Sequence, residues 1–329
     1  MSLSDNPPEW VFKFLSCPKC KNELCFNNNL VACVCNNCNS VYEYQNSIIK
    51  FVNDNNYSQT FGDQWNKFSK TQIDSFANSK ESFLRFFNET NFSAEELSEG
   101  VTLDAGCGAG RFMDIALRYG AKVIGLDYSS SVIAASQNMN NLNHNKNNYI
   151  LIQASIYEMP IKNFVIDRIY SIGVLQHMPH RRKAVIALSN VLKTNGRISM
   201  WVYEKSFRSL LGYKYWIRPM VKKLSLKQKL ILSKSLVILF LPLGLLFNCI
   251  PVLNKYFLRF LPFAFRKPRK KSSLKEILEW SVLDTYDNIS PEYDNPISEK
   301  NLISWFKESN IIEIKRLVTP SLALTGKKK

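Results

Sequence analysis

The stretch Val101–Arg111, VTLDAGCGAGR, decides how the chain folds. An apolar run ends in Asp104, glycines follow at positions 106, 108 and 110, and helix-forming residues come next. This pattern predicts a buried parallel strand, a tight glycine turn and a helix whose first amide groups point at a ligand above the turn. Glycine is needed in the turn because a side chain would hold the ligand away from the backbone.

The next predicted strand, AKVIGLD, ends in Asp127, about 20 residues after the glycines. An acidic side chain at that position accepts hydrogen bonds from both hydroxyls of a ribose. The spacing Gly-x-Gly-x-Gly after Asp104 departs from the Gly-x-Gly-x-x-Gly pattern that holds a pyrophosphate. It resembles the motif of class I S-adenosylmethionine-dependent methyltransferases. The alternative is an ordinary βαβ turn followed by a chance aspartate.

This resemblance implies a cofactor, a fold and a set of binding residues. The fold is α/β, with a Rossmann-like seven-stranded methyltransferase sheet. In that family an Asp commonly ends the third strand and binds the adenine amino group, whereas this chain has Ser155, whose hydroxyl can still accept a hydrogen bond. The residues expected to bind S-adenosylmethionine are Asp104, Gly106, Gly108, Gly110, Asp127, Tyr128, Ser155, Ile156, Ile172, Gly173 and Gln176.

The fourth strand is predicted to start near Asp167 and to end at Ile172-Gly173. Ligands of open α/β sheets lie at the carboxyl ends of the strands, so His177 is expected at the reactive end of the cofactor. His177 is the candidate general base. The alternative is that it hydrogen-bonds the cofactor or caps the next helix.

The last parts of the sheet are a helix over 180–193, a turn at Asn195-Gly196 and the strand RISMWVY. From Ser298 on, a serine-capped helix and the strands IIEIKRLVT and SLALTG match the end of the methyltransferase sheet, whose last strand runs antiparallel. After Asp127, the segment SSSVIAASQNM is expected to form a helix with a serine cap.

Two further stretches resemble a bacterial methyltransferase subfamily. Its members share F-G-x-Q-W-x-x-F before the glycine motif, as in FGDQWNKF here, and Gln64, Trp65 and Phe68 either cap the cofactor site or pack as core. Its pattern W-x-x-L-D-T-Y/F-D-x-x-S-P-x-Y matches residues 280–293. That segment either lines an acceptor site or is a loop that ties an insertion to the sheet.

The first 52 residues carry two Cys-x2-Cys motifs, the spacing of a four-cysteine zinc site. They resemble a Trm112-like zinc ribbon, a small domain fused to or partnered with methyltransferases. Cys33 is an alternative to Cys35 as a ligand. A structural clip is favoured over a partner platform because four protein ligands leave no open position for chemistry on the metal. The predicted ligands are Cys17, Cys20, Cys35 and Cys38.

With 329 residues, of which 46% are hydrophobic, the chain is long enough for a large and a small unit. The expected domains are a zinc ribbon (1–52), a linker (53–60), a methyltransferase core (61–203), an apolar and basic helical insertion (204–297) and the end of the core (298–329). No basic region followed by an apolar run marks a secretory signal, so a cytoplasmic location is expected.

The formal charge of +16 lies in one segment. Between Lys205 and Lys275 there are 17 Lys and Arg and no Asp or Glu. Within it, 236–253 is uncharged and long enough to approach a membrane span, but Pro242, Gly244, Asn248 and Pro251 interrupt it. A break with basic flanks, including RKPRKK (266–271), favours a helical hairpin in one leaflet or interfacial helices on anionic lipid. A soluble apolar lid and a nucleic-acid face are the alternatives.

The sequence therefore predicts an S-adenosylmethionine-dependent methyltransferase held at the inner face of a membrane. The expected acceptor is an amphiphilic small molecule, a lipid or a lipid-linked glycan intermediate. The alternatives are a soluble glycan or small-molecule O-methyltransferase, an RNA methyltransferase, and a scaffold that binds the cofactor without catalysis. RNA is disfavoured because the basic residues are interleaved with Leu, Ile and Phe rather than with polar or stacking residues.

Overall fold

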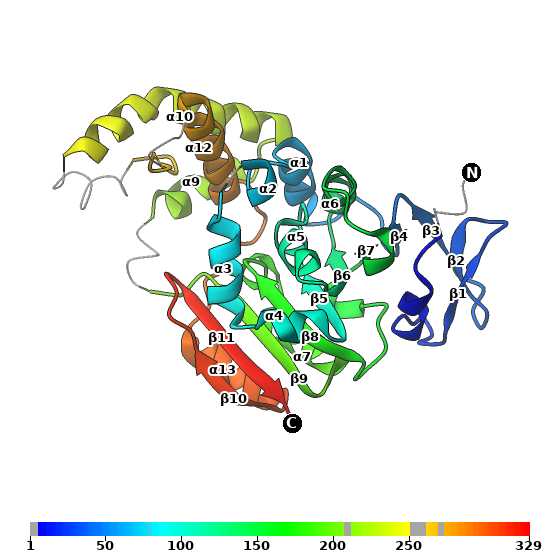
Figure 1. The fold of residues 1–329 in the computed structure, drawn as a ribbon. Helices are drawn as coiled ribbons and strands as arrows, with labels where there is room; N and C mark the ends of the chain where they lie inside the picture. The colour runs from blue at the N-terminus through cyan, green and yellow to red at the C-terminus, as the bar shows by residue number, and fades with distance from the viewer. Residues whose placement is uncertain (1–5, 78, 207–211, 251–260, 269–272) are drawn as a thin grey trace. The chain divides into compact units, whose positions relative to one another are not determined.

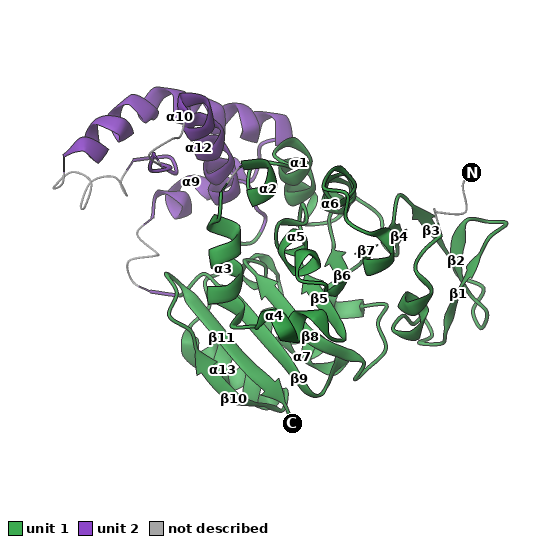
Figure 2. Cartoon of the chain, in the orientation of Figure 1, with its two compact units in different colours: residues 1–204, 293–329 green, residues 205–292 purple. Residues whose placement is uncertain are grey.

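A computed structural model describes residues 6–77, 79–206, 212–250, 261–268 and 273–329. The chain forms two compact units (Figure 2). We call residues 1–204 with 293–329 the sheet unit, and residues 205–292 the helical unit. The domain boundaries expected from the sequence remain predictions.

The sheet unit is built around one mixed sheet of eleven strands (Figure 1). The strands are β1 (Leu24–Asn27), β2 (Ala32–Cys35), β3 (Val41–Gln45), β4 (Ile48–Lys50), β5 (Val101–Ala105), β6 (Lys122–Asp127), β7 (Tyr149–Gln153), β8 (Ile166–Ile172), β9 (Leu192–Val202), β10 (Ile311–Arg316) and β11 (Leu322–Lys328). Their order across the sheet is β1-β2-β3-β4-β7-β6-β5-β8-β9-β11-β10.

Helices pack around this sheet. The α-helices of the sheet unit are α1 (Gln59–Lys67), α2 (Asp74–Ala77), α3 (Glu81–Thr90), α4 (Ala94–Ser98), α5 (Arg111–Arg118), α6 (Ser131–Asn141), α7 (Arg181–Val191) and α13 (Glu299–Glu308). Short 3-10 helices are η2 (Glu9–Lys13), η3 (Lys146–Asn148), η4 (Ile156–Glu158) and η5 (Leu175–His177).

The seven strands from β5 to β11 confirm the predicted α/β fold. Strands β7, β6, β5, β8 and β9 are parallel neighbours, and β11 runs antiparallel to both β9 and β10. Every residue of β5 and β7 is buried, which explains why both strands are mainly apolar in sequence. The carboxyl ends of five parallel strands therefore meet at one edge of the sheet.

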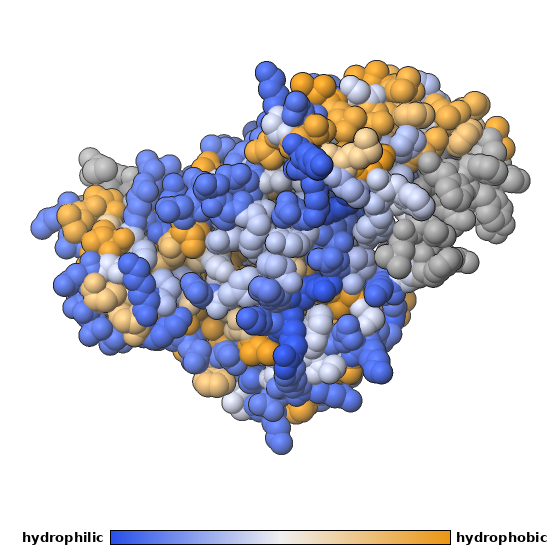
Figure 3. Space-filling view, turned by 180° about the vertical axis from the view of Figure 1, so that it is seen from behind, coloured by the Kyte–Doolittle hydropathy of each residue, from blue (hydrophilic) through white to orange (hydrophobic). Residues whose placement is uncertain are grey.

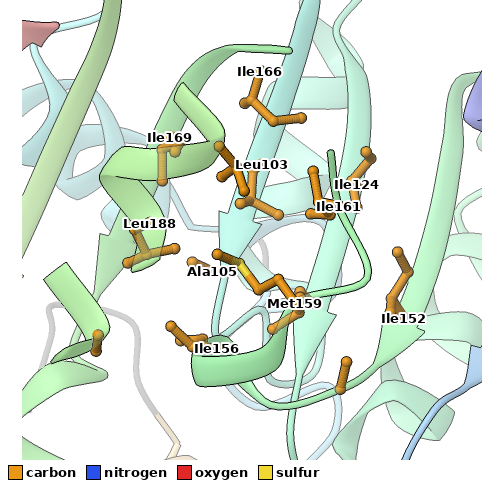
Figure 4. Close-up of a cluster of buried hydrophobic side chains, with 14 of the residues drawn as sticks. Leu103, Ala105, Ile124, Ile152, Ile156, Met159, Ile161, Ile166, Ile169 and Leu188 are labelled. Carbon is orange, nitrogen blue, oxygen red and sulfur yellow. The ribbon is translucent and has the colours of Figure 1, made fainter. Parts of the chain in front are cut away.

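A hydrophobic core fills the space between one face of the sheet and the elements that cover it (Figure 4). Leu103 and Ala105 of β5 point into it, and Leu188 of α7 meets them from the covering layer. Met159 and Ile161, from the segment after η4, close the same cluster. This packing holds β5 and β8 in place, and with them the loops that follow these strands.

The first four strands do not form a separate sheet. Strands β1 to β4 are antiparallel neighbours, but β4 pairs in parallel with β7 through Ile49 and Ile152. The pairing continues in a hydrogen bond from the Phe51 amide to the Gln153 carbonyl oxygen, at 2.9 Å. The N-terminal cysteine-containing segment thus extends the main sheet beyond β7.

Two local expectations in the sheet unit hold only in part. The Asn195-Gly196 pair lies inside β9 rather than in a turn before it, because the ladder with β8 is irregular between Ile166 and Arg168 and takes up the extra residues. Helix α6 begins after Ser130, whose side chain makes no capping hydrogen bond. Instead the Oγ of Ser129 accepts a hydrogen bond from the Ser131 amide at 3.2 Å.

The helical unit contains α9 (Tyr213–Val221), α10 (Leu226–Cys249) and α12 (Leu274–Ile289). The predicted break inside 236–253 does not occur between residues 236 and 249, where α10 continues through Pro242. Pro242 has no amide hydrogen to donate to the Ile238 carbonyl oxygen. Both residues lie on the exposed side of the helix. Residues 251–253, and 269–271 of the predicted basic cluster, lie outside the described residues.

Helix α12 replaces the loop considered for WSVLDTYDN. It begins with a capping box in which Ser273 and Glu276 bind each other's backbone amides. At its other end, the buried Arg218 guanidinium donates to the carbonyl oxygens of Asn288 and Pro291, at 3.2 and 2.7 Å. The first bond satisfies a carbonyl group that the helix end leaves unpaired, and the second holds the chain just beyond the helix, so α9 and α12 are fastened together.

Candidate active site

The glycine turn after β5 has the tight geometry that its sequence predicts. Gly106 and Gly108 have φ angles of 93° and 53°, in the left-handed region that favours glycine. A Cβ atom on Gly106 would lie 2.3 Å from a methyl carbon of Val174, so a side chain does not fit. The amides of Gly106 and Cys107 both donate to the Leu126 carbonyl oxygen, at 2.7 and 3.0 Å, which fastens the turn to β6.

Asp127 stands at the end of β6, next to this turn. Its Oδ2 atom accepts a hydrogen bond from the Gly108 amide at 3.0 Å. Its Oδ1 atom accepts from the amide and the hydroxyl of Ser129, at 2.8 and 2.7 Å. The carboxylate is therefore oriented before any ligand arrives, as a ribose-binding acid needs to be.

Asp104, the last polar residue of β5, is buried. The Tyr170 hydroxyl donates to its Oδ2 atom at 3.0 Å. Burial raises the pKa of the Asp104 carboxyl well above its usual range, and the charge of Asp127 raises it further, while the Tyr170 hydrogen bond lowers it. A positively charged ligand nearby would favour the ionised form of this carboxyl.

The carboxyl end of β8 carries an amide without a partner. Gln176 is fully buried, and neither its Oε1 nor its Nε2 atom has a hydrogen-bond partner among the described residues. The Nε2 atom lies 3.8 Å from the position that a Cβ on Gly173 would occupy, and Gly173 has a φ of 79°. A buried amide without partners is costly, so this one fits a polar ligand at the end of β8. Ile172 and Gly173 border the same place.

His177 is held by a hydrogen bond and by ring contacts. Its Nδ1 atom lies 2.9 Å from the Tyr293 carbonyl oxygen, which can only accept, so Nδ1 carries a proton; in the neutral ring Nε2 then holds the lone pair. The imidazole contacts the rings of Phe61 and Tyr203, with centroid distances of 4.9 and 5.6 Å. A neutral imidazole in this tautomer can accept a proton at Nε2.

Ser155 and Ile156 follow β7 and begin η4. The Ser155 hydroxyl oxygen accepts from the Tyr157 amide at 3.2 Å and so acts as the N-cap of this short helix. Its O–H group can still donate to a ligand. The Ala154 amide donates to the Asp127 carbonyl oxygen at 3.0 Å, which brings the loops after β6 and β7 together.

Helix α1 lies against the glycine turn. A Cβ on Gly108 would come within 3.3 Å of the Trp65 indole nitrogen, so this ring packs over the turn. Gln64 is fully buried on the same helix, and Phe68, the residue after its last turn, is partly exposed. The contact between Trp65 and Gly108 favours the capping role considered for this residue.

Several aromatic residues at the site were not singled out from the sequence. The Tyr57 ring contacts the rings of Tyr128 and Tyr293, with centroid distances of 5.2 and 5.6 Å. Trp201 and Tyr203 stand at the carboxyl end of β9, where the strand-end rule that selected Gln176 would also have selected them. Tyr57 lies before α1 and carries no comparable signal in the sequence.

The four predicted cysteine ligands form one cluster. The Sγ atoms of Cys17, Cys20, Cys35 and Cys38 all lie within 4.8 Å of one another. The distance from Cys17 to Cys38 is 3.6 Å, and that from Cys20 to Cys35 is 3.4 Å. Tetrahedral zinc with Zn–S bonds of about 2.3 Å separates its sulfurs by about 3.8 Å, so the cluster is compatible with zinc.

Both cysteine turns have the same backbone geometry. In the first, the Lys21 amide donates to the Cys17 carbonyl oxygen, and Lys21 has a φ of 61°. In the second, the Asn39 amide donates to the Cys35 carbonyl oxygen, and Asn39 has a φ of 54°. Cys33 is not part of the cluster; it lies on β2 among buried residues.

The thiol pKa of Cys35 is raised to about 11, as that of Cys33 is raised, so the pKa values do not decide between these two residues. A hydrogen bond from the Asn22 amide is the main cause that lowers the pKa of Cys20 to about 6. Burial raises the pKa of Cys33 to about 12, so this thiol stays protonated. Cys35 rather than Cys33 is the fourth ligand candidate, because the Cys35 Sγ atom belongs to the cluster and that of Cys33 does not.

A family model described as a methyltransferase domain matches residues 103–200, from β5 to β9. No curated protein sequence matches the chain.

Three solved structures illustrate the likeness in fold. One is a candidate sarcosine dimethylglycine methyltransferase from Galdieria sulphuraria, with 22% identity over 32% of this chain and 40% of that chain, and a TM-score of 0.31. The second is a candidate S-adenosyl-L-methionine-dependent methyltransferase from Methanococcus maripaludis, with 15% identity over 84% and 96% of the chains and a TM-score of 0.46. The third is geranyl diphosphate C-methyltransferase from Streptomyces coelicolor A3(2), with 10% identity over 77% and 79% of the chains and a TM-score of 0.45. The chain spans less than half the length of the first of these proteins.

The family match and the geometry concern the same residues. Positions 103–200 include the glycine turn and Asp127, whose carboxylate is fixed by the Gly108 amide. Gln176, the buried amide that needs a partner, also lies within the matched range. Residues 103–200, which carry this candidate cofactor site, therefore match the methyltransferase-domain family.

Proposed function

We propose that the protein transfers a methyl group to an amphiphilic acceptor, a lipid or a lipid-linked intermediate, at an anionic membrane surface. The observation that carries this proposal is the surface of α10. Its exposed positions include Ile231, Ile238, Leu239, Leu243 and Leu246. Their spacing of seven, one, four and three residues places them on one side of a helix.

The opposite side of α10 is the less apolar one. The buried positions of this helix are Lys229, Ser233, Val237, Leu241 and Gly244. A surface helix of a soluble protein normally buries its apolar side and exposes the polar one. The exposed apolar side of α10 therefore favours contact with lipid.

Other features of the helical unit support a lipid surface. Figure 3 shows hydrophobic atoms gathered over this unit. Trp216 and Met220 of α9 are 73% and 77% exposed. Between residues 205 and 275 every charged residue is basic, which suits anionic headgroups. In the described part of the chain, α10 is the one helix long and apolar enough to cross a membrane, which by itself is weak support.

The residues at the strand ends suit methyl transfer to a hydroxyl group. When bound, S-adenosylmethionine supplies an electrophilic methyl group on a positively charged sulfur. In this proposal Asp127 holds the ribose, and Gln176 binds a polar group at the end of β8. His177 takes the proton of the acceptor hydroxyl at Nε2, and the rings of Phe61 and Tyr203 beside it exclude water.

The acceptor class can be tested with methyl-labelled S-adenosylmethionine and an extract of the source cells. After the reaction, label is measured in organic-soluble, aqueous, RNA and protein fractions. We expect label in the organic-soluble fraction. Label confined to RNA or to water-soluble glycan would reject the amphiphilic acceptor.

Membrane binding can be tested separately by flotation with vesicles that contain anionic lipid. The double substitution Ile238→Glu and Leu239→Glu changes two positions that are 65% and 70% exposed, and we expect it to reduce flotation strongly. The control, Ile312→Glu with Val318→Glu, adds the same charge at exposed apolar positions near β10 and should float like the unchanged protein. Equal flotation of all three proteins would reject the role of α10.

A further inference from the structure

The chain passes between the two units at places that both adjoin His177. It leaves the sheet unit after Glu204 and returns at Tyr293. The ring of Tyr203, just before the exit, contacts the His177 imidazole, and the carbonyl oxygen of Tyr293 accepts from its Nδ1 atom. The Nδ1 bond joins residues that lie 116 positions apart in the sequence.

The returning segment, residues 293–297 with the sequence YDNPI, is held on both sides. We call it the strap. On one side, the Asn295 amide donates to the Gln176 carbonyl oxygen at 2.8 Å. On the other, the Ile297 amide donates to the Tyr203 carbonyl oxygen at 2.8 Å. The strap therefore connects the turn after β8 with the end of β9.

One side chain outside the strap fastens its centre. The Arg181 guanidinium, at the start of α7, donates to the Asn295 carbonyl oxygen at 3.1 Å. Both backbone groups of Asn295 thus have partners. The contact aligns the strap with the helix that follows His177.

The sequence of the strap makes it stiff. Pro296 fixes its own φ angle and restricts Asn295 to extended conformations. Ile297 is almost fully buried in the main core and anchors the strap at one end. At the other end the Tyr293 ring packs on Tyr57. A stiff segment can hold a hydrogen-bond acceptor at a fixed place.

We infer that the strap selects the protonation form of His177, and that Arg181 and Pro296 are positioning residues for this histidine. The Tyr293 carbonyl oxygen accepts the Nδ1 proton, which leaves Nε2 as the basic atom. A carbonyl at this place also stabilises the imidazolium that forms when Nε2 takes a proton. The catalytic part of this inference rests on the proposed role of His177 as the base.

The tautomer can be measured without knowing the acceptor. Nitrogen-15 NMR of the imidazole rings distinguishes protonated from unprotonated nitrogens, and the spectrum of His177→Gln assigns the His177 signals among the three histidines. In the unchanged protein we expect a protonated Nδ1 and an unprotonated Nε2. In Pro296→Gly and in Arg181→Gln we expect a shift toward the Nε2-protonated tautomer that free histidine prefers.

Two variants control for general effects. Asn295→Ala leaves both backbone bonds of that residue in place and should keep the Nδ1-protonated form. Arg181→Lys can still donate to the Asn295 carbonyl oxygen. It should therefore keep most of the Nδ1-protonated form that Arg181→Gln loses. An Nε2-protonated ring in the unchanged protein, or identical spectra in Pro296→Gly, Arg181→Gln and Asn295→Ala, would overturn the inference.

Turnover separates this inference from the proposed function. With methyl-labelled S-adenosylmethionine and the cell extract, we expect Pro296→Gly and Arg181→Gln to lose about 10-fold in rate with an unchanged KM for the cofactor. If His177→Gln keeps full turnover, the role of His177 as base is wrong. The NMR measurement of the tautomer then still tests whether the strap selects the protonation form of His177. If His177→Gln is inactive and the strap variants keep both tautomer and rate, the strap inference alone is wrong.

Discussion

The Gly108 amide and the Asp127 carboxylate are joined by a hydrogen bond of 3.0 Å, so the glycine turn and the acid at the end of β6 form one structure. Asp127→Ala should weaken binding of S-adenosylmethionine about 100-fold, because two hydrogen bonds to a charged group are lost. Isothermal titration with S-adenosylhomocysteine, well below the unfolding temperature, measures this loss. Asp63→Ala, which removes a partly buried acid of α1 paired with Lys67, is the matched control; an equal loss in both variants would contradict the assigned role.

Asp104 provides a prediction about pH. Its pKa in the folded protein is raised, so from about pH 4 upward, where the unfolded carboxyl ionises, the folded state holds more protons than the unfolded state. Stability therefore falls as pH rises, until the pH passes the folded pKa. Asp104→Asn removes the fall in stability that ionisation of Asp104 causes. The melting temperature of this variant, relative to that of the unchanged protein, should therefore be higher at pH 8 than at pH 5. A constant difference would show that ionisation of Asp104 does not contribute.

Gln176 should limit the stability of the ligand-free protein. Because its buried amide has no hydrogen-bond partner within the described part of the chain, Gln176→Leu should raise the free energy of unfolding by about 1 kcal/mol without ligand. The same change should reduce the stabilisation that S-adenosylhomocysteine gives, since the amide can no longer bind it. Thermal unfolding with and without the ligand tests both effects. If S-adenosylhomocysteine stabilises Gln176→Leu as much as the unchanged protein, the Gln176 amide binds the acceptor rather than the cofactor.

The four-cysteine cluster predicts bound zinc. The purified protein should contain about one zinc ion per chain, as expected for a closed four-thiolate site. Cys20→Ser and Cys38→Ser should each lower the zinc content sharply and also lower the melting temperature. Cys33→Ala is the control, because Cys33 lies outside the cluster. Elemental analysis measures the metal, and loss of zinc in the control would mean that the ligand set is different.

Much of the sheet unit could be predicted from local sequence. The apolar run before Asp104 and the glycines after it define a strand and a turn whatever the rest of the chain does. The two Cys-x2-Cys motifs likewise define their own turns. Each of these signals lies within a few residues, which is why the structure places them as expected.

Contacts between distant residues could not be predicted in this way. The parallel pairing of β4 with β7 joins segments about a hundred residues apart, and neither sequence indicates which strand it pairs with. The Nδ1 partner of His177 is a backbone carbonyl, which every residue carries. In the helical unit, Pro242 ends no helix because its own position and that of Ile238 face outward.

The pairing of β4 with β7 also bears on how the protein avoids aggregation. Strand β7 has the sequence YILIQ, with no charge and no proline, and without β4 its outer edge would offer unpaired amides to another chain. A chain shortened to begin after residue 52 would therefore tend to associate strand to strand. Cys35 of the cysteine cluster is the last residue of β2, so a metal bound there would help to hold β2, and with it β3 and β4, in place beside this edge. The N-terminal segment thus covers the outer edge of β7, and this role does not depend on any contribution to methyl transfer.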